Sequence, residues 1–186
     1  LSAALLLPKI AARRRLNRGF EALALSADER WLYVVFQSAL AHPDESVHER
    51  GLTVRIWKLD AHTGQLEAQF LYPFDGPETF VRDALGTDWS DLKICEAVTL
   101  APDKLLLLER ASKTAKIYIV HLSPEFEAPA TYLRVETRPS LEQMDETSLE
   151  NAGVRLLYKT LVFSTADAPQ IGPYLEGMAL LSPSEL

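Results

Sequence analysis

Three glutamates each stand at the start of an apolar segment and could supply a shared set of carboxylates. Glu21 precedes Ala-Leu-Ala-Leu, Glu96 precedes Ala-Val-Thr-Leu, and Glu176 precedes Gly-Met-Ala-Leu. If these units are related by rotation, the three side chains point at one axis. Crowded carboxylates do not all stay ionised without a cation, and Ca²⁺ accepts about six to eight oxygen ligands. One prediction for the three glutamates is therefore a Ca²⁺ site.

A structural role is the competing prediction for the same side chains. A glutamate that opens a strand can accept backbone hydrogen bonds from a neighbouring unit and so join the units together. The two roles are compatible. If the glutamates bind Ca²⁺, the cation would hold a phosphate or polarise an ester and its attacking water.

Two arginines are candidate substrate-binding residues. Arg18 follows the basic run Arg13-Arg14-Arg15, where a guanidinium could bind phosphate, although a solvated loop is the competing interpretation. Arg110 stands beside Glu109 at the end of an apolar segment, where it could clamp an anion. A plain salt bridge is the alternative for Arg110.

Other reactive residues favour structural roles. Cys95, the only cysteine, lies in an apolar strand and is expected to be buried and inert. Lys159, within the apolar segment 156–163, is expected to face outward at a sheet edge. The sequence has no glycine-rich phosphate loop and no G-x-S-x-G motif, which argues against a nucleotide enzyme or an α/β-hydrolase. Surface or turn positions are expected for the four histidines, which share no metal-ligand spacing: His42, His48, His62 and His121.

The elements that would position these residues are short strands in a repeated order. Each unit reads as a strand headed by glutamate, a tight turn and further strands, which predicts successive four-stranded antiparallel meanders typical of a β-propeller. The strands expected in the first unit are 20–26, 31–38, 52–59 and 66–72. Those of the second are 94–100, 105–110, 116–122 and 131–136, with 156–164 as the other candidate for its outer strand.

We expect an all-β, single domain over 1–186 with about two blades and the start of a third. Its parts are a connector (1–19), a first blade (20–73), a second blade with an insertion (93–164) and the opening of a third (174–186). The glutamates lie 75 and 80 residues apart, more than the roughly 40–50 residues of a simple blade. Insertions at 39–51, 73–92 and 137–155 account for the difference. Closing a ring of about 4–8 blades would need a longer natural chain or partner subunits, so the sequence is expected to be a fragment.

Composition restricts the class of partner. The chain has 186 residues, 47% hydrophobic and 24% charged, which is ordinary for a globular protein. A net charge of −7 argues against a nucleic-acid partner, which would require a basic face. No apolar run reaches the length of about 18 residues that would span a membrane, and no signal peptide is visible.

Several motifs together resemble the phytase-like family, which is described as the esterase-like activity of phytase. The first is Asn17-Arg18-Gly19-Phe20-Glu21 with the apolar run after it. The others follow in the family's order along 17–186, at 31–40, 54–64, 93–110 and 174–181. The sequence departs from the family at Ala22, where glycine is usual. The family's acidic run after the third motif would lie beyond Leu186, so those candidate metal ligands are missing from this sequence.

The resemblance implies a β-propeller that is often exported, here to the periplasm or outside the cell. It also implies a hydrolase of small-molecule phosphate or carboxylic esters, to which the glutamates could add Ca²⁺ assistance. A non-catalytic β-propeller that serves as a binding or scaffold module is the alternative, since a fold does not imply an activity.

Overall fold

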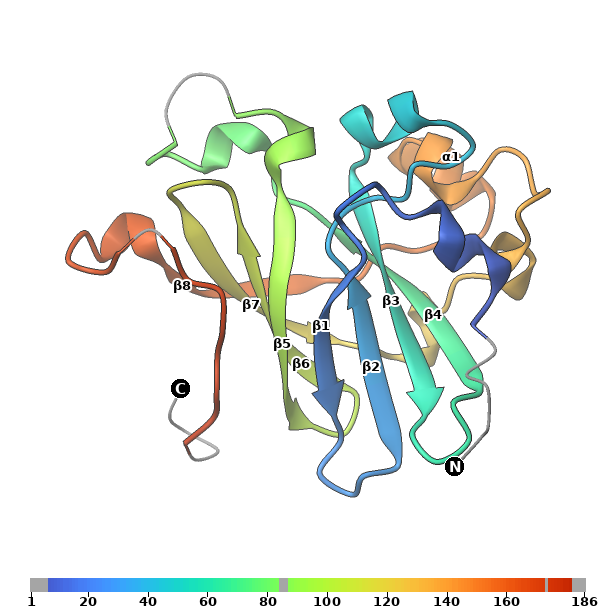
Figure 1. Cartoon of the computed structure of the whole chain (residues 1–186), viewed down its shortest axis with the longest axis horizontal. Helices are drawn as coiled ribbons and strands as arrows, with labels where there is room; N and C mark the ends of the chain where they lie inside the picture. The colour runs from blue at the N-terminus through green and yellow to red at the C-terminus, as the bar shows by residue number, and fades with distance from the viewer. Residues whose placement is uncertain (1–6, 84–86, 173, 182–186) are drawn as a thin grey trace.

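The computed structural model describes residues 7–83, 87–172 and 174–181, which contain two four-stranded antiparallel sheets (Figure 1). In each sheet the strands lie in sequence order. The first sheet holds β1 (Phe20–Leu25), β2 (Trp31–Phe36), β3 (Thr53–Asp60) and β4 (Leu66–Pro73). The second holds β5 (Lys93–Ala101), β6 (Lys104–Arg110), β7 (Ala115–His121) and β8 (Lys159–Ser164).

Helices are short and lie in the connections. The α-helix is α1 (Glu146–Asn151), and no helix among the described residues is long and apolar enough to cross a membrane. The 3₁₀ helices are η1 (Lys9–Arg13), η2 (Glu45–Arg50), η3 (Pro77–Thr79), η4 (Trp89–Asp91), η5 (Pro124–Phe126), η6 (Ala130–Leu133), η7 (Leu141–Gln143) and η8 (Thr165–Asp167).

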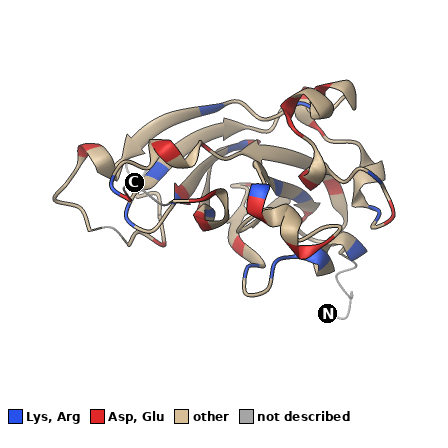
Figure 2. Ribbon diagram, turned by 90° about the horizontal axis from the view of Figure 1, so that it is seen from above, with Lys and Arg blue, Asp and Glu red and all other residues tan. Residues whose placement is uncertain are grey.

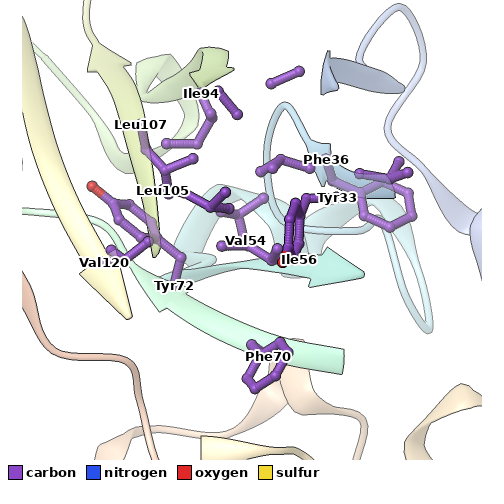
Figure 3. Packing of buried hydrophobic residues seen from close by; sticks show 14 of the residues in the cluster. Tyr33, Phe36, Val54, Ile56, Phe70, Tyr72, Ile94, Leu105, Leu107 and Val120 are labelled. Carbon is purple, nitrogen blue, oxygen red and sulfur yellow. The ribbon is translucent and has the colours of Figure 1, made fainter. Parts of the chain in front are cut away.

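The two sheets face each other across the main hydrophobic core. β1 and β5 run side by side in Figure 1, and Figure 3 shows Val54 and Tyr72 of the first sheet near Leu105 and Leu107 of the second. All four of these side chains are buried. β6 carries consecutive buried leucines at 105–108, which shows that both of its faces are covered. The apolar run of this inner strand is therefore the pattern expected of a strand that is buried on both faces.

The segment that leaves β7 at Leu122 covers the other face of the first sheet before it returns as β8. Leu71 of β4 packs against Leu141 and Leu149 of this excursion. Arg55 on β3 donates two hydrogen bonds to the Glu142 carboxylate, at 2.7 and 3.0 Å, and both side chains are only 2% exposed. This bidentate ion pair fixes the excursion to a sheet that is distant in sequence.

The all-β prediction with two four-stranded units is confirmed, but the strand predicted at 131–136 is wrong. Those residues contain the end of η6 and lie in the excursion, and β8 is the outer strand. Side chains of the first sheet bind the backbone carbonyls of this segment, in place of the hydrogen bonds of a β-strand. Arg55 donates to the Tyr132 carbonyl oxygen at 2.8 Å. Gln69 donates to the Pro129 carbonyl oxygen at 3.0 Å. No strand is assigned in 174–181, the described part of the third unit.

The surface or turn position predicted for His42 is also wrong. Its side chain is buried under the excursion, where Arg138 lies 3.1 Å from Nε2 and Ser140 donates to its carbonyl oxygen. Burial lowers the pKa of His42, so the ring is neutral near pH 7. His62 and His121 are exposed, as expected.

A network of charged side chains, buried at Glu109 and Lys116 and partly buried at Lys159 and Asp75, joins the two sheets. Glu109 on β6 is fully buried and accepts hydrogen bonds from the Tyr72 hydroxyl of β4 and from Lys159 Nζ of β8 at 2.8 Å. Lys159 Nζ also lies 2.7 Å from an oxygen of Asp75, just after β4. The other oxygen of Asp75 is 2.7 Å from Lys116 Nζ of β7. Lys159 was expected to face outward, and that prediction is wrong, because its ammonium is held between two carboxylates inside the interface.

Burial and pairing shift the pKa values of Glu109 and Asp75 in opposite directions. Burial raises the pKa of Glu109, although Lys159 and Tyr72 act against this shift. Burial would also raise the pKa of Asp75, but hydrogen bonds from Lys116, Lys159 and Tyr118 together outweigh it and lower the pKa to about 2. The fold therefore holds Asp75 as a carboxylate well below neutral pH.

Replacement of Lys159 by methionine should destabilise the protein strongly. The variant leaves Glu109 buried without its cation, and removal of one partner of a buried pair typically costs about 3–5 kcal/mol. Urea denaturation followed by tryptophan fluorescence measures the free energy of unfolding. The control is Lys113→Met at an exposed turn position, which should change this free energy by less than about 0.5 kcal/mol. Equal effects of the two substitutions would contradict the role of the network.

Asp75 should make stability fall in acid. Because its folded pKa lies below the ordinary value of about 4, ionised Asp75 stabilises the fold above pH 4, and this stabilisation is lost as pH falls toward 2. The difference in unfolding free energy between wild type and Asp75→Asn should therefore shrink by about 2 kcal/mol between pH 5 and pH 2.5. Glu109 has a shift of opposite sign but is present in both proteins. A constant difference across this range would contradict the prediction.

Candidate functional site

The first two motif glutamates lie on neighbouring strands that open the two sheets. Glu21 is on β1 and exposed, and Glu96 is on β5 and half-buried. A β-bulge interrupts the register at each position, between Phe20 and Ala22 and between Ile94 and Glu96. Glu96 Oε1 accepts the Ala97 backbone N–H at 2.9 Å, so part of its hydrogen-bonding capacity is used within its own strand.

The third motif lies against the second sheet, on the face away from the first. Leu175, Met178 and Leu180 pack on the cluster that contains Leu106 and Leu108. A Cβ atom placed at Gly177 would lie 4.0 Å from Glu96 Oε2, so the third motif passes close to the second one. Tertiary structure thus brings Glu96 near the Glu176 segment.

Arg110 at the end of β6 is the central cation of this region. Its side chain is buried, its Nη2 lies 2.6 Å from Glu176 Oε1, and its Nε lies 3.2 Å from Cys95 Sγ. Nη1 is buried and makes no hydrogen bond to any described residue. A buried guanidinium with an unpartnered donor is uncommon, because unsatisfied buried donors are costly.

Arg18 reaches the same side of the molecule from the segment before β1. Its Nη1 donates to the Leu92 carbonyl oxygen at 3.0 Å, and Arg15 donates in the same way to Ser90 at 2.8 Å. Burial and then the charge of Arg15 lower the pKa of Arg18, while the charges of Asp91 and Glu21 oppose this shift. Arg18 is thus half-buried and anchors the entry to β5, with Glu21 close enough to act on its charge.

Cys95 is buried beneath Arg110, as predicted. Burial raises the pKa of its thiol, and the Arg110 guanidinium opposes the shift less strongly. The thiol is therefore protonated at neutral pH, which makes it a poor nucleophile.

The fit of a cation to the three glutamates can be tested from their contacts. Within the described ranges, no group of three or more His, Cys, Asp or Glu side chains is placed to hold one metal ion. Glu176 is paired with Arg110, and Glu96 accepts a hydrogen bond from its own strand. The Glu176–Arg110 ion pair joins the third motif to β6 through side chains, whereas the structural alternative was acceptance of backbone hydrogen bonds from a neighbouring unit. Calcium binding by Glu21, Glu96 and Glu176 stays a prediction.

The charged network around Glu109 is the feature that sequence reasoning missed. A usable signal was present: Glu109, Lys116 and Lys159 are charged residues inside otherwise apolar strands. Register places Glu109 directly opposite Lys116 on β7. Charges inside a buried strand usually require partners on the facing element, so they indicate a paired interface and not an outward position.

The protein is thus an all-β protein of repeated four-stranded meanders, with a buried arginine where the second and third glutamate motifs meet. The model of the phytase-like family, described as esterase-like activity of phytase, matches residues 2–184. Because the match covers nearly the whole chain, the protein belongs to this family, and the resemblance drawn from the motifs is confirmed. Comparison with curated proteins and with solved structures gave no match.

The calcium prediction can be decided by isothermal titration calorimetry. If the glutamates share a cation, Ca²⁺ binds the wild-type chain, and the variant Glu21→Gln/Glu96→Gln/Glu176→Gln loses that binding because it lacks all three charges. A control with the same loss of charge at exposed positions elsewhere should bind as wild type does: Glu49→Gln/Glu67→Gln/Glu136→Gln. Unchanged Ca²⁺ binding in the variant that lacks the three motif glutamates would contradict the metal assignment.

Proposed function

We propose that this protein is a hydrolase of small esters that carry an anionic group, with Arg110 as the residue that binds this group. The observation behind the proposal is the buried guanidinium of Arg110, whose Nη1 has no hydrogen-bond partner in the part of the chain that the structure describes. The chain also belongs to the esterase-like phytase family. Phosphate and carboxylate groups match the fork of donors on a guanidinium. Both phosphate esters and carboxylic esters therefore lie within the proposed substrate class.

The existing partner of Arg110 leaves room for a ligand. The Glu176 side chain is 70% exposed, while that of Arg110 is 5% exposed. An anion could therefore displace Glu176 without unpacking the core, and it would gain a charge-assisted hydrogen bond worth about 1.5–3 kcal/mol. Arg18 is the second proposed contact for the substrate, on the side of Glu21.

Water is the proposed nucleophile. Cys95 is buried and protonated, and in the described part of the chain no serine, threonine or cysteine side chain is hydrogen-bonded to a histidine ring. Glu96, half-buried with Oε2 toward the third motif, is the proposed general base for the attacking water. If Ca²⁺ is bound, Glu96 would instead be one of its ligands with Glu21 and Glu176, and the cation would polarise the ester and activate the water.

The proposal includes a β-propeller arrangement and export from the cytoplasm. The contact of residues 174–181 with the second sheet supports the first part, because a further inner strand would pack there in the same way as the second sheet packs on the first. Export to the periplasm or outside the cell follows the resemblance to the family.

A non-catalytic binding module is the second candidate. It is favoured by the lack of an assembled nucleophile–base pair among the described residues. In this case Arg110 would hold an anionic group of a ligand that is bound and not cleaved.

Arg110→Lys should reduce hydrolysis of anionic esters selectively. Lysine keeps the charge but loses the planar set of donors. We expect kcat/KM for 4-nitrophenyl phosphate to fall by about 10–100-fold, mainly through KM, and kcat/KM for neutral 4-nitrophenyl acetate to change by less than about threefold. Chromogenic assays with and without Ca²⁺ measure both.

The matched control for this prediction is Arg134→Lys, at an exposed position in the excursion. It should leave both rates unchanged. Equal losses on the anionic and neutral esters in Arg110→Lys would show a structural effect and contradict the anion role. Failure of the wild-type protein to hydrolyse any ester in a broad panel would favour the binding module.

A further inference from the structure

An open cleft lies apart from the inner-strand site, between the first sheet and the returning excursion. Its volume is about 1310 Å³. Leu52 and Phe74, which flank β3 and β4, line one side. Leu149 and Leu157 of the excursion line the other side. The lining is therefore mainly apolar where the two parts of the chain meet.

Aromatic side chains stand along this cleft. Phe126 and Tyr158 pack edge to face, with ring centroids 5.3 Å apart and an interplanar angle of 83°. Tyr158 is 82% exposed, and Trp89 also lines the cleft. Exposed aromatic rings of this kind bind both apolar groups and the cations of lysine and arginine side chains.

The charged lining is acidic. Glu125, Glu146 and Glu150 line the cleft, all three are exposed, and none forms an ion pair with a described residue. Glu146 and Glu150 are four residues apart on α1, an arrangement of like charges that weakens a helix.

Two basic residues also line the cleft, but only one adds net charge. Lys159 is already neutralised by Glu109 and Asp75, which leaves Arg155 against three carboxylates. The lining therefore attracts cations.

We propose that this cleft binds a basic, partly apolar peptide segment of a partner protein. Lysine or arginine side chains would meet Glu125, Glu146 and Glu150 and the Tyr158 ring, and apolar side chains would lie on the floor. The volume exceeds the roughly 300–1,000 Å³ of a small-molecule pocket, and the cleft is open to solvent, which suits a peptide better than a small amine. The negative lining and the apolar floor together set this chemistry.

Fluorescence anisotropy with a labelled peptide of alternating lysine and leucine tests the proposal on the full chain. The wild-type protein should bind this peptide and should not bind a matched peptide of alternating glutamate and leucine. The charge-reversed variant Glu146→Lys/Glu150→Lys should lose binding by at least about tenfold. Circular dichroism checks that the variant is folded, and Tyr158→Ala should weaken binding without any change of charge.

The control variant is Glu49→Lys/Glu67→Lys, which makes the same change of net charge at exposed positions outside the cleft. It should retain binding to within about twofold. Equal losses in the two charge-reversed variants would mean that the peptide senses only overall charge, and this would overturn the proposal. Binding of phenethylamine without binding of the peptide would also overturn it, in favour of a small-amine pocket. These outcomes are independent of ester hydrolysis.

Discussion

The pairing of charges buried between the two sheets is the constraint on which this structure depends. Glu109 is fully enclosed, and an isolated carboxylate in such a place would be very costly. The Glu109 carboxylate accepts hydrogen bonds from Lys159 Nζ, the Tyr72 hydroxyl and the Asp75 backbone N–H. These donors come from β8, β4 and the segment just after β4. The last strand of the second sheet must therefore return to the last strand of the first. The same return creates the wall of the acidic cleft.

Ion pairs also attach the excursion and the third motif to the outer faces of the sheets. Arg55 and Glu142 hold the excursion on one outer face with every charged atom well paired. Arg110 and Glu176 hold the third motif on the outer face of the second sheet. Here Arg110 Nη1 has no partner within the described ranges, and the Glu176 carboxylate is exposed. Every nitrogen of the Arg55 guanidinium therefore has a partner. The Arg110–Glu176 pair has one donor that a ligand could use, and the proposed chemistry is assigned there for this reason.

The two proposed sites select opposite charges on a protein of net charge −7. Figure 2 shows Lys and Arg positions interspersed with Asp and Glu positions along the ribbon, so selectivity comes from local arrangement. At the inner strands, a buried guanidinium favours an anion in spite of the surrounding acids. At the cleft, exposed rings and carboxylates that form no ion pair with a described residue favour a cation. Burial strengthens the first interaction, and exposure makes the second depend on salt.

The sequence by itself determined the all-β class, seven of the eight strands in their order, the burial of Cys95 and the family. Period-two alternation, apolar runs and turn residues are local signals, and they are readable without coordinates. Only tertiary structure decided that β8 and not 131–136 closes the second sheet and that His42 is buried. It also decided that Lys159 points into the interface and that Arg110 Nη1 has no hydrogen-bond partner among the described residues. These features depend on contacts between residues far apart in sequence, where one partner alone does not reveal the other.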